Sequence, residues 1–309
     1  MKKVLYPILV IIVFTVMQVF GALAMLAISF IKNPDVFMAI ARSGNQEAFL
    51  SYAMMGDSLA WALIIADIGM IIVLAALNMI DWKYVVNFKM IDWKVGAFSI
   101  VGAVFLIFYS DVISEWLDLP DDMSKIFAGM SLTVAGALSI GVIGPIAEEF
   151  VFREALLGSM LKGGMNKWVA ITASALVFGI IHWNPAQIPF ATIIGFIFGI
   201  IYYKTGNIVI PSILHIVNNS TAVVMMLVIG EEAQDASMTE WIGGPIYAMG
   251  ICAPIIVIGV TWLRVFYKKY KVERFADMPT AAVEQIESTE IIEQTEQTNQ
   301  IPITNETVL

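Results

Sequence analysis

Long apolar runs, separated by short polar segments, dominate the chain up to about residue 270. Runs long enough to cross a hydrocarbon core of about 30 Å are typical of membrane-spanning helices. We predict eight such helices, over 4–31, 58–80, 96–113, 127–162, 168–183, 190–203, 208–229 and 245–266. The composition agrees, because 59% of the 309 residues are hydrophobic and only 14% are charged. The predicted fold class is therefore an all-α polytopic membrane protein, with the first apolar run kept as an uncleaved helix.

Basic residues beside the predicted helices favour one orientation. With the N-terminus in the cytoplasm, twelve lysines and arginines fall on the cytoplasmic side, and three, Lys32, Arg42 and Lys125, fall on the other side. Cytoplasmic loops of membrane proteins usually carry the excess of lysine and arginine. We therefore expect a multi-pass protein of the cell membrane, with both termini in the cytoplasm and the segments 33–56 and 231–241 outside it.

The composition changes after Lys271, where Glu, Gln, Thr, Ile and Pro replace the apolar runs. Eight of the 26 acidic residues follow residue 270, so much of the formal charge of −9 belongs to this tail. No face of the segment could bury enough apolar surface to fold alone. We predict a disordered acidic tail over 272–309.

Ionisable side chains at membrane depth are the first candidates for chemistry, because burying charge in lipid is costly and marks functional sites by default. The stretch 144–154 places three glutamates and one arginine inside the fourth predicted helix. On a helix, Glu149 and Arg153 lie four positions apart and meet on one face. Glu148 is turned about 100° away from Glu149 and is left for another partner. Asp67, in the second predicted helix, is interpreted either as a partner of this group or as a helix–helix hydrogen bond.

The chain has two histidines, and both lie within apolar segments. The helical rise of 1.5 Å per residue gives the depth of each residue from a lysine near the end of its helix. Glu148 lies ~21 Å from Lys162, His182 lies ~22 Å from Lys167, and His215 lies ~16 Å from Lys204. All three are therefore predicted near the middle of the membrane. Phe178 and His182 lie four positions apart, as do His215 and Asn219, so each pair shares one helical face.

Together these motifs resemble the CPBP family, which comprises the type II CAAX prenyl proteases and the bacteriocin-processing or immunity-related Abi proteins. The resemblance covers about residues 128–230 and rests on three motifs in this order: Glu148-Glu149-x-x-x-Arg153, Phe178-x-x-x-His182 and His215-x-x-x-Asn219. It implies an intramembrane endopeptidase. The implied substrate is a membrane-anchored peptide or protein, of the prenylated or the bacteriocin leader type.

The same resemblance implies roles for the site residues. Glu148 and His182 would activate water, and His215 and Asn219 would hold the oxyanion or a metal. In a metal version, Glu148, His182 and His215 would bind one divalent ion such as zinc; in a metal-free version, Glu148 would be the general base. We prefer the metal-free version, because two histidines and one carboxylate leave no spare base beside a metal. The residues expected to be structural are Glu149, Arg153 and Phe178.

Four regions are predicted: helices one to three with their loops over 1–126, the catalytic core over 127–230, an outer loop with the last helix over 231–271, and the tail over 272–309.

Two other function classes stay open, a non-catalytic membrane scaffold or bacteriocin-immunity protein that keeps the fold, and a secondary transporter. The lone cysteine, Cys252, excludes an internal disulfide and a cysteine-based zinc site. The expected partners are the lipid bilayer and the membrane-anchored substrate, and no nucleic acid.

The orientation is open to a direct test. Single cysteines placed in 33–56 or 231–241 should react with a membrane-impermeant thiol reagent in intact cells, because the lysine asymmetry puts these segments outside. Cysteines placed after Lys271 should react only after the membrane is opened. Labelling of the tail in intact cells would contradict the predicted orientation.

Overall fold

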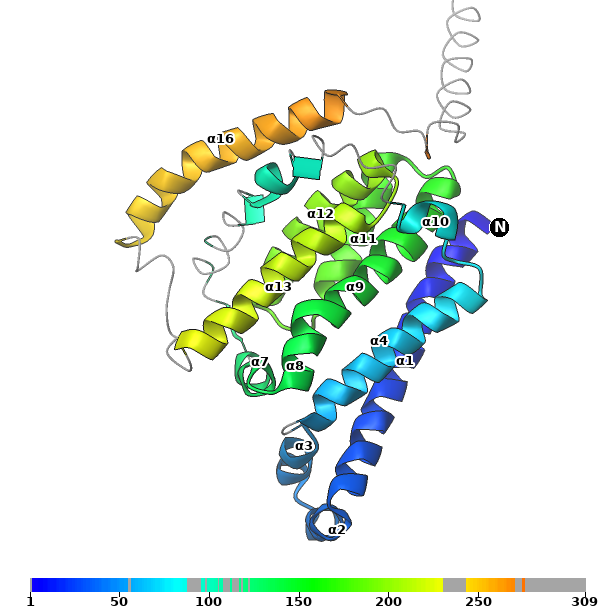
Figure 1. Ribbon diagram of the computed structural model, residues 1–309, viewed down its shortest axis with the longest axis vertical. Coiled ribbons are helices and arrows are strands. Elements are labelled where there is room, and N and C mark those ends of the chain that lie inside the picture. The colour runs from blue at the N-terminus through cyan, green and yellow to red at the C-terminus, as the bar shows by residue number, and fades with distance from the viewer. Residues whose placement is uncertain are drawn as a thin grey trace, which may run out of the picture.

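A bundle of helices makes up the part of the chain described in a computed structural model (Figure 1). The structure describes residues 2–54, 57–87, 96–97, 99–104, 106–107, 112, 117, 119–121, 123–229, 243–269 and 274–275. Throughout these residues the regular structure is helical and no strand is found, which confirms the all-α prediction. Five helices within them are long and apolar enough to cross a membrane. The predicted total of eight is not confirmed.

The helices before the candidate site are α1 (Lys2–Lys32), α2 (Pro34–Ser43), α3 (Gln46–Met54), α4 (Asp57–Ala76), α5 (Trp82–Val85) and α7 (Ser124–Ser131). One long helix follows and consists of α8 (Val134–Leu138), η2 (Ser139–Ile143), α9 (Gly144–Glu148), η3 (Glu149–Leu157) and α10 (Gly158–Lys162). The last four are α11 (Lys167–Ile180), α12 (Gln187–Thr205), α13 (Val209–Ile229) and α16 (Pro245–Lys269).

Three of the predicted spans differ from the structure or fall outside its description. The fifth, predicted over 168–183, is α11, which has 14 residues and ends at Ile180. The apolar part of α16, Ala253–Val265, is also shorter than a full span. Most of the third predicted span, 96–113, lies outside the described residues.

The fourth predicted span starts later than the sequence suggested. We predicted one helix from residue 127, but α7 ends at Ser131 and the long helix begins at Val134. Thr133 is extended, with φ −106° and ψ 149°, and its hydroxyl accepts a hydrogen bond from the Gly136 N–H. A threonine in this conformation is a favourable N-cap, so it separates the two helices.

Close packing brings α11 and α12 together as a helical hairpin. A Cβ atom added at Gly195 would lie 3.2 Å from the Cα of Ala175, and one added at Gly199 would lie 3.1 Å from Ile171 Cγ2. Small residues at such positions let helix backbones approach closely. Gly195 and Gly199 are therefore packing residues. Helix α11 also packs on the long helix, where Ser174 donates a hydrogen bond to the Phe152 carbonyl.

Gly144 and Pro145 lie at a junction between a π-helical and an α-helical segment. Pro145 has no N–H, so the carbonyl groups four and five positions before it lose a donor that a regular helix would supply. Helix α13 supplies side chains instead: Ser220 Oγ donates to the Gly141 carbonyl at 3.0 Å, and Asn219 Nδ2 donates to the Ile140 carbonyl at 3.1 Å. The junction therefore joins the long helix to α13.

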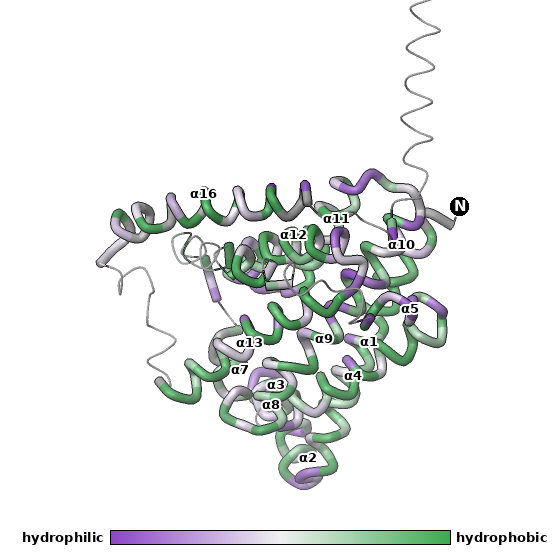
Figure 2. The backbone as a smooth tube through the Cα atoms, turned by 45° about the horizontal axis from the view of Figure 1, so that its top comes forward, coloured by the Kyte–Doolittle hydropathy of each residue, from purple (hydrophilic) through white to green (hydrophobic). Residues whose placement is uncertain are grey.

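The segments predicted to be cytoplasmic gather at one end of the bundle. Lys162, at the end of α10, contacts Asp81 before α5, and the N–H of Ile208 donates to the Val85 carbonyl. In Figure 2 the long helices are mainly hydrophobic, while hydrophilic stretches recur near the labels α2, α5 and α10. This grouping agrees with the predicted topology, whose inward direction stays a prediction.

The hydrogen bond of Ser220 can be tested against a neighbouring hydroxyl. Ser220→Ala should destabilise the protein in detergent by about 0.6–1.7 kcal/mol, the range for hydrogen bonds between membrane helices. Thr221→Val is the matched control, because the Thr221 hydroxyl donates to Val217 of its own helix. Equal thermal unfolding curves for Ser220→Ala and the wild-type protein would contradict the role of the junction.

Candidate functional site

The candidate site is built on the irregular part of the long helix. Two π-helical segments, η2 and η3, flank the short helix α9 whose last residue is Glu148. A π-helical turn inserts a residue into a helix and is frequent at functional sites. Within η3 the contact of Glu149 with Arg153, four positions later, is kept.

Glu149 and Arg153 form a buried ion pair. Arg153 Nε lies 3.0 Å from Glu149 Oε2, and the two side chains are 1% and 0% exposed. The rings of Phe178 and Phe198 lie 4.4 Å and 5.4 Å from the guanidinium carbon. The aromatic faces offer the cation a favourable, water-free contact. The two phenyl rings therefore cover the guanidinium group of the buried pair.

His215 lies between the two adjacent glutamates. Its Nδ1 is 3.0 Å from Glu149 Oε1, and its Nε2 is 3.5 Å from Glu148 Oε2. Glu149 is held as a carboxylate by Arg153, so it can only accept a hydrogen bond, and Nδ1 of His215 must carry the proton. The Nε2 atom then faces a second carboxyl group, and the Nε2–Glu148 contact is favourable when one further proton is shared between them.

Glu148 differs from Glu149 in its access to the surroundings. The Glu148 side chain is 29% exposed, whereas that of Glu149 is fully buried. Adjacent helical positions point about 100° apart, which explains the contrast. Glu148 is therefore the carboxylate of the pair that a water molecule and a substrate can reach.

His182 contacts Phe178, whose ring also contacts His215. Its Nδ1 atom donates to the Phe178 carbonyl at 2.7 Å, because a carbonyl oxygen can only accept, and this leaves Nε2 with its lone pair. The Phe178 ring lies 5.0 Å from the His182 ring and 5.8 Å from the His215 ring. The phenyl group thus contacts both imidazoles.

The position of His182 in the chain corrects one expectation. We predicted it inside the fifth span, but α11 ends at Ile180 and His182 lies in the turn that follows. The next residue, Trp183, has a φ of 51° and is 85% exposed. A left-handed backbone at a bulky residue is rare and tends to occur at functional sites.

Asn219 makes a different contact from the one the resemblance implied. Its amide nitrogen donates to the Ile140 carbonyl at 3.1 Å, and its oxygen accepts from Asn218 at 3.1 Å. The structure therefore places Asn219 against the junction that carries Glu148. Among the described residues, the hydrogen bonds of Asn219 go to Ile140 and Asn218, and none joins it to His215 or Glu148.

The proposed metal ligands do not fit an ion in this arrangement. Among the residues that the structure describes, no group of three His, Cys, Asp or Glu side chains could hold one metal ion. A zinc site needs three protein ligand atoms, each about 2.0–2.2 Å from a single point. Glu148 and His215 are in contact, whereas the described contacts of His182 are with Phe178.

Two residues near the site had no partner assigned from the sequence. Asp67 of α4 lies close to the junction, because a Cβ added at Gly144 would be 3.7 Å from Asp67 Oδ2. Glu154, the third glutamate of the stretch, binds Tyr202 and Arg274 at the end of the bundle. Its charge at membrane depth was the available signal, but a partner 120 positions away could not be found from spacing.

Comparisons with known proteins match the same part of the chain. Residues 130–221 match the family model described as type II CAAX prenyl endopeptidase Rce1-like, which confirms the resemblance predicted from the three motifs. The "Membrane-embedded CAAX protease MroQ" of Staphylococcus aureus (strain USA300) is 31% identical over 103 residues, 32% of this chain and 42% of the relative. The "Putative membrane peptidase YdiL" of Bacillus subtilis (strain 168) is 33% identical over 86 residues, 28% of this chain and 35% of the relative.

The alignments cover only part of this chain and only part of each relative. The match spans less than half the length of either relative, so it compares the core and not the whole proteins. No solved structure matches the chain significantly.

The buried pair can be tested by a double-mutant cycle. Glu149→Ala and Arg153→Ala should each cost about 3–5 kcal/mol, because each leaves a buried charge without its partner. The double variant should lose less than the sum of the single losses. Thermal unfolding and protein abundance measure this, and strictly additive losses would show that the two groups do not interact.

A partly exposed pair between the end of the long helix and the residue before α5 serves as the control for that cycle. Lys162 Nζ lies 3.4 Å from Asp81 Oδ2, with both side chains about a third exposed. Lys162→Ala should change stability by less than about 1 kcal/mol, as exposed ion pairs do.

Proposed function

We propose that this chain is a membrane-embedded endopeptidase of the CAAX-protease type, in which Glu148 activates the attacking water. The observation that carries the proposal is the environment of Glu148. It is the partly exposed carboxylate beside His215, and His215 is fixed from its other side by the buried Glu149–Arg153 pair. A base that is accessible and a neighbour that is oriented are what general base catalysis requires.

The reaction follows from the protons available at this site. A water molecule hydrogen-bonded to Glu148 loses a proton to the carboxylate, and its oxygen attacks the carbonyl carbon of the peptide bond. The new C–O bond gives a tetrahedral intermediate with a negative oxygen. The C–N bond then breaks as the proton passes from Glu148 to the leaving nitrogen, which yields a carboxylic acid and an amine.

His215 and His182 are assigned separate tasks. His215 Nε2, when protonated, donates to the developing negative oxygen or to Glu148, since its Nδ1 is held by Glu149. His182 keeps a lone pair on Nε2, because its Nδ1 donates to the Phe178 carbonyl. We assign His182 to orienting the water together with Glu148.

Asn219 is assigned to positioning Glu148. Its hydrogen bond to the Ile140 carbonyl holds the segment that leads into α9. The other hypothesis for Asn219, as a donor to the oxyanion, requires its amide to turn away from Ile140. The two roles differ in what Asn219→Ala does. A positioning role lowers thermal stability together with turnover, while an oxyanion role lowers turnover by about 10²–10³ at unchanged stability.

The proposed substrate is a membrane-anchored peptide or protein. Five helices of the described chain are long and apolar enough to cross a membrane, and the site lies within the long helix and α13. A substrate must therefore reach a carboxylate that is surrounded by apolar helices, which favours a peptide tethered to the bilayer. The named relatives, a CAAX protease and a membrane peptidase, support the same reaction class.

Reconstituted protein gives the decisive assay. Purified chain in vesicles, given a panel of membrane-anchored peptides that includes prenylated and leader-type members, should cleave at least one of them. Glu148→Gln should lower the rate by about 10²–10⁴, the usual contribution of a general base. Its unfolding temperature should stay close to that of the wild-type protein, because Glu148 is partly exposed.

Two results would contradict the proposal. Cleavage by Glu148→Gln at the wild-type rate would remove Glu148 from the chemistry. Binding of the peptides without cleavage by the wild-type chain would favour the scaffold or immunity hypothesis. Loss of activity with a chelator, followed by recovery with zinc, would replace the metal-free mechanism while keeping the peptidase.

A further inference from the structure

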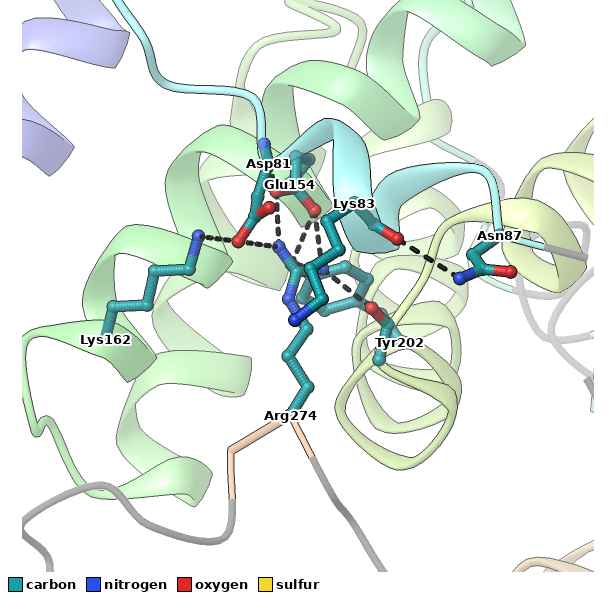
Figure 3. A network of polar contacts seen from close by, with 8 residues as sticks. Asp81, Lys83, Asn87, Glu154, Lys162, Tyr202 and Arg274 are labelled. Carbon is teal, nitrogen blue, oxygen red and sulfur yellow. Dashed lines mark hydrogen bonds and ion pairs between the residues drawn. The ribbon is translucent and has the colours of Figure 1, made fainter. Parts of the chain in front are cut away.

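A second buried polar cluster lies at the end of the bundle where α5, α10 and α12 meet (Figure 3). Its centre is the Glu154 carboxylate, which is fully buried. Arg274 binds both oxygens of this carboxylate, through Nη2 at 2.6 Å and Nη1 at 2.9 Å. A two-point contact of this kind is the geometry for which a guanidinium group is specific.

Further contacts complete the binding of Arg274. Its Nη1 also donates to the Gly206 carbonyl at 2.7 Å, and lies 3.2 Å from the Tyr202 hydroxyl. The Tyr202 hydroxyl itself donates to Glu154 at 2.9 Å. Burial alone would lower the pKa of Arg274, but Tyr202, Glu154 and Asp81 raise it above its ordinary value, so the guanidinium stays charged. Only 2% of its side chain is exposed.

Aromatic rings form the walls of the same site. The Arg274 guanidinium carbon lies 4.8 Å from the Tyr84 ring, 5.8 Å from the Tyr202 ring and 5.4 Å from the Phe275 ring. Phe275 is itself 5% exposed, and its ring stacks on Tyr203 at 5.9 Å with an interplanar angle of 11°. Two consecutive side chains, the arginine Arg274 and the aromatic residue Phe275, therefore pack into this site.

This segment belongs to the region predicted as the acidic tail. The predicted boundary is residue 272, yet Arg274 and Phe275 pack into the membrane domain, while the residues after 275 lie outside the described part of the chain. The two residues follow the end of α16 at Lys269 by only a few positions. Nothing in the local composition distinguished them, because their partners lie 68 or more positions earlier.

Glu154 links this cluster to the candidate active site. It is part of η3, the π-helical segment that begins with Glu149 and contains Arg153. Within the described residues, Arg274 is the cation paired with Glu154, and its Nη2 also lies 3.7 Å from Asp81 Oδ2, whereas Lys162 is paired with Asp81 alone. Without Arg274, a buried carboxylate would keep only the Tyr202 hydroxyl and the Asp81 N–H, which donates at 3.0 Å. A buried charge that loses its partner is strongly unfavourable, so η3 would have to shift or admit water.

We propose that Tyr84, Glu154, Tyr202, Tyr203 and Gly206 form a binding site for a short arginine–aromatic peptide segment. The chain's own Arg274-Phe275 is its resident ligand, and occupancy holds η3 in the geometry that places Glu149 and Arg153. Arg274 is thus a positioning residue that acts through Glu154. The binding part of this proposal is independent of the reaction, and the positioning part rests on the proposed peptidase function.

Binding is tested on the full-length chain with its own ligand removed. The variant Arg274→Ala/Phe275→Ala should bind a dye-labelled peptide with the sequence of residues 271–277, measured by fluorescence anisotropy in detergent. Adding Glu154→Gln to the variant should weaken binding by about 30-fold or more, as expected for loss of a buried charge partner. A control peptide with alanine at the arginine position should be weakened equally, and the wild-type chain should bind little because its site is filled. Equal binding by all chains and peptides would overturn the proposal.

A measurement on the wild-type chain does not depend on any variant folding. Trypsin should cleave after Arg274 much more slowly in the folded protein than in the free 271–277 peptide, because the guanidinium is buried against Glu154. Glu154→Gln should speed this cleavage, followed by mass spectrometry. Cleavage of the wild-type chain at the rate of the free peptide would show that Arg274 is not bound.

The positioning role is tested by the cleavage assay. Arg274→Ala/Phe275→Ala should lower kcat with little change in KM, and adding the 271–277 peptide should restore kcat, whereas the alanine control peptide should not. Arg274→Lys should restore little, since lysine keeps the charge but lacks the planar fork. Unchanged kcat in the double variant would overturn the positioning role. A wild-type chain that cleaves nothing would instead count against the proposed peptidase function, and the anisotropy and trypsin results would still decide the binding site.

Discussion

The buried carboxylate of Glu149 is the interaction on which the site depends. One of its oxygens faces Arg153 at 3.0 Å, and the other faces His215 Nδ1 at 3.0 Å. A charge with no access to water is tolerated only when its partners are fixed, so Glu149 determines both the tautomer and the orientation of His215. The accessible Glu148 then meets the remaining imidazole nitrogen. In this account the reactive carboxylate and the structural carboxylate are adjacent in sequence because a helix turns them to different surroundings.

The long helix carries two buried acids that belong to different polar clusters. Glu149 faces α13 and the candidate site, and Glu154 faces the cluster formed with Tyr202 and Arg274. Both belong to η3, whose π-helical turns depart from the regular α-helix on either side. Each of these two carboxylates is bound by side chains of other helices or of the segment after α16. The geometry of η3 is therefore sensitive to a change at either carboxylate, which connects the end of the chain to the site.

Local spacing accounts for what the sequence predicted well. The contact of Glu149 with Arg153 needs only two positions on one helical face, and the contrast in exposure between Glu148 and Glu149 needs only adjacent positions. The all-α fold followed from the apolar runs. What failed required information from elsewhere in the chain. The hydrogen bond of Asn219 to Ile140 depends on Pro145, which removes a backbone donor, and the early end of α11 places His182 in a turn. The pairing of Glu154 with Arg274 crosses 120 positions and has no local pattern.

The central claim, that Glu148 meets the scissile bond, is tested most directly by an experimental structure of the Glu148→Gln chain with an uncleaved membrane-anchored peptide bound. The account predicts that one peptide carbonyl carbon lies about 3–3.5 Å from a water oxygen that is hydrogen-bonded to the side chain at position 148, the separation of a reactive arrangement. It also predicts that His215 still contacts Glu149. A peptide held with its cleaved bond far from position 148, beside other side chains, would contradict the account.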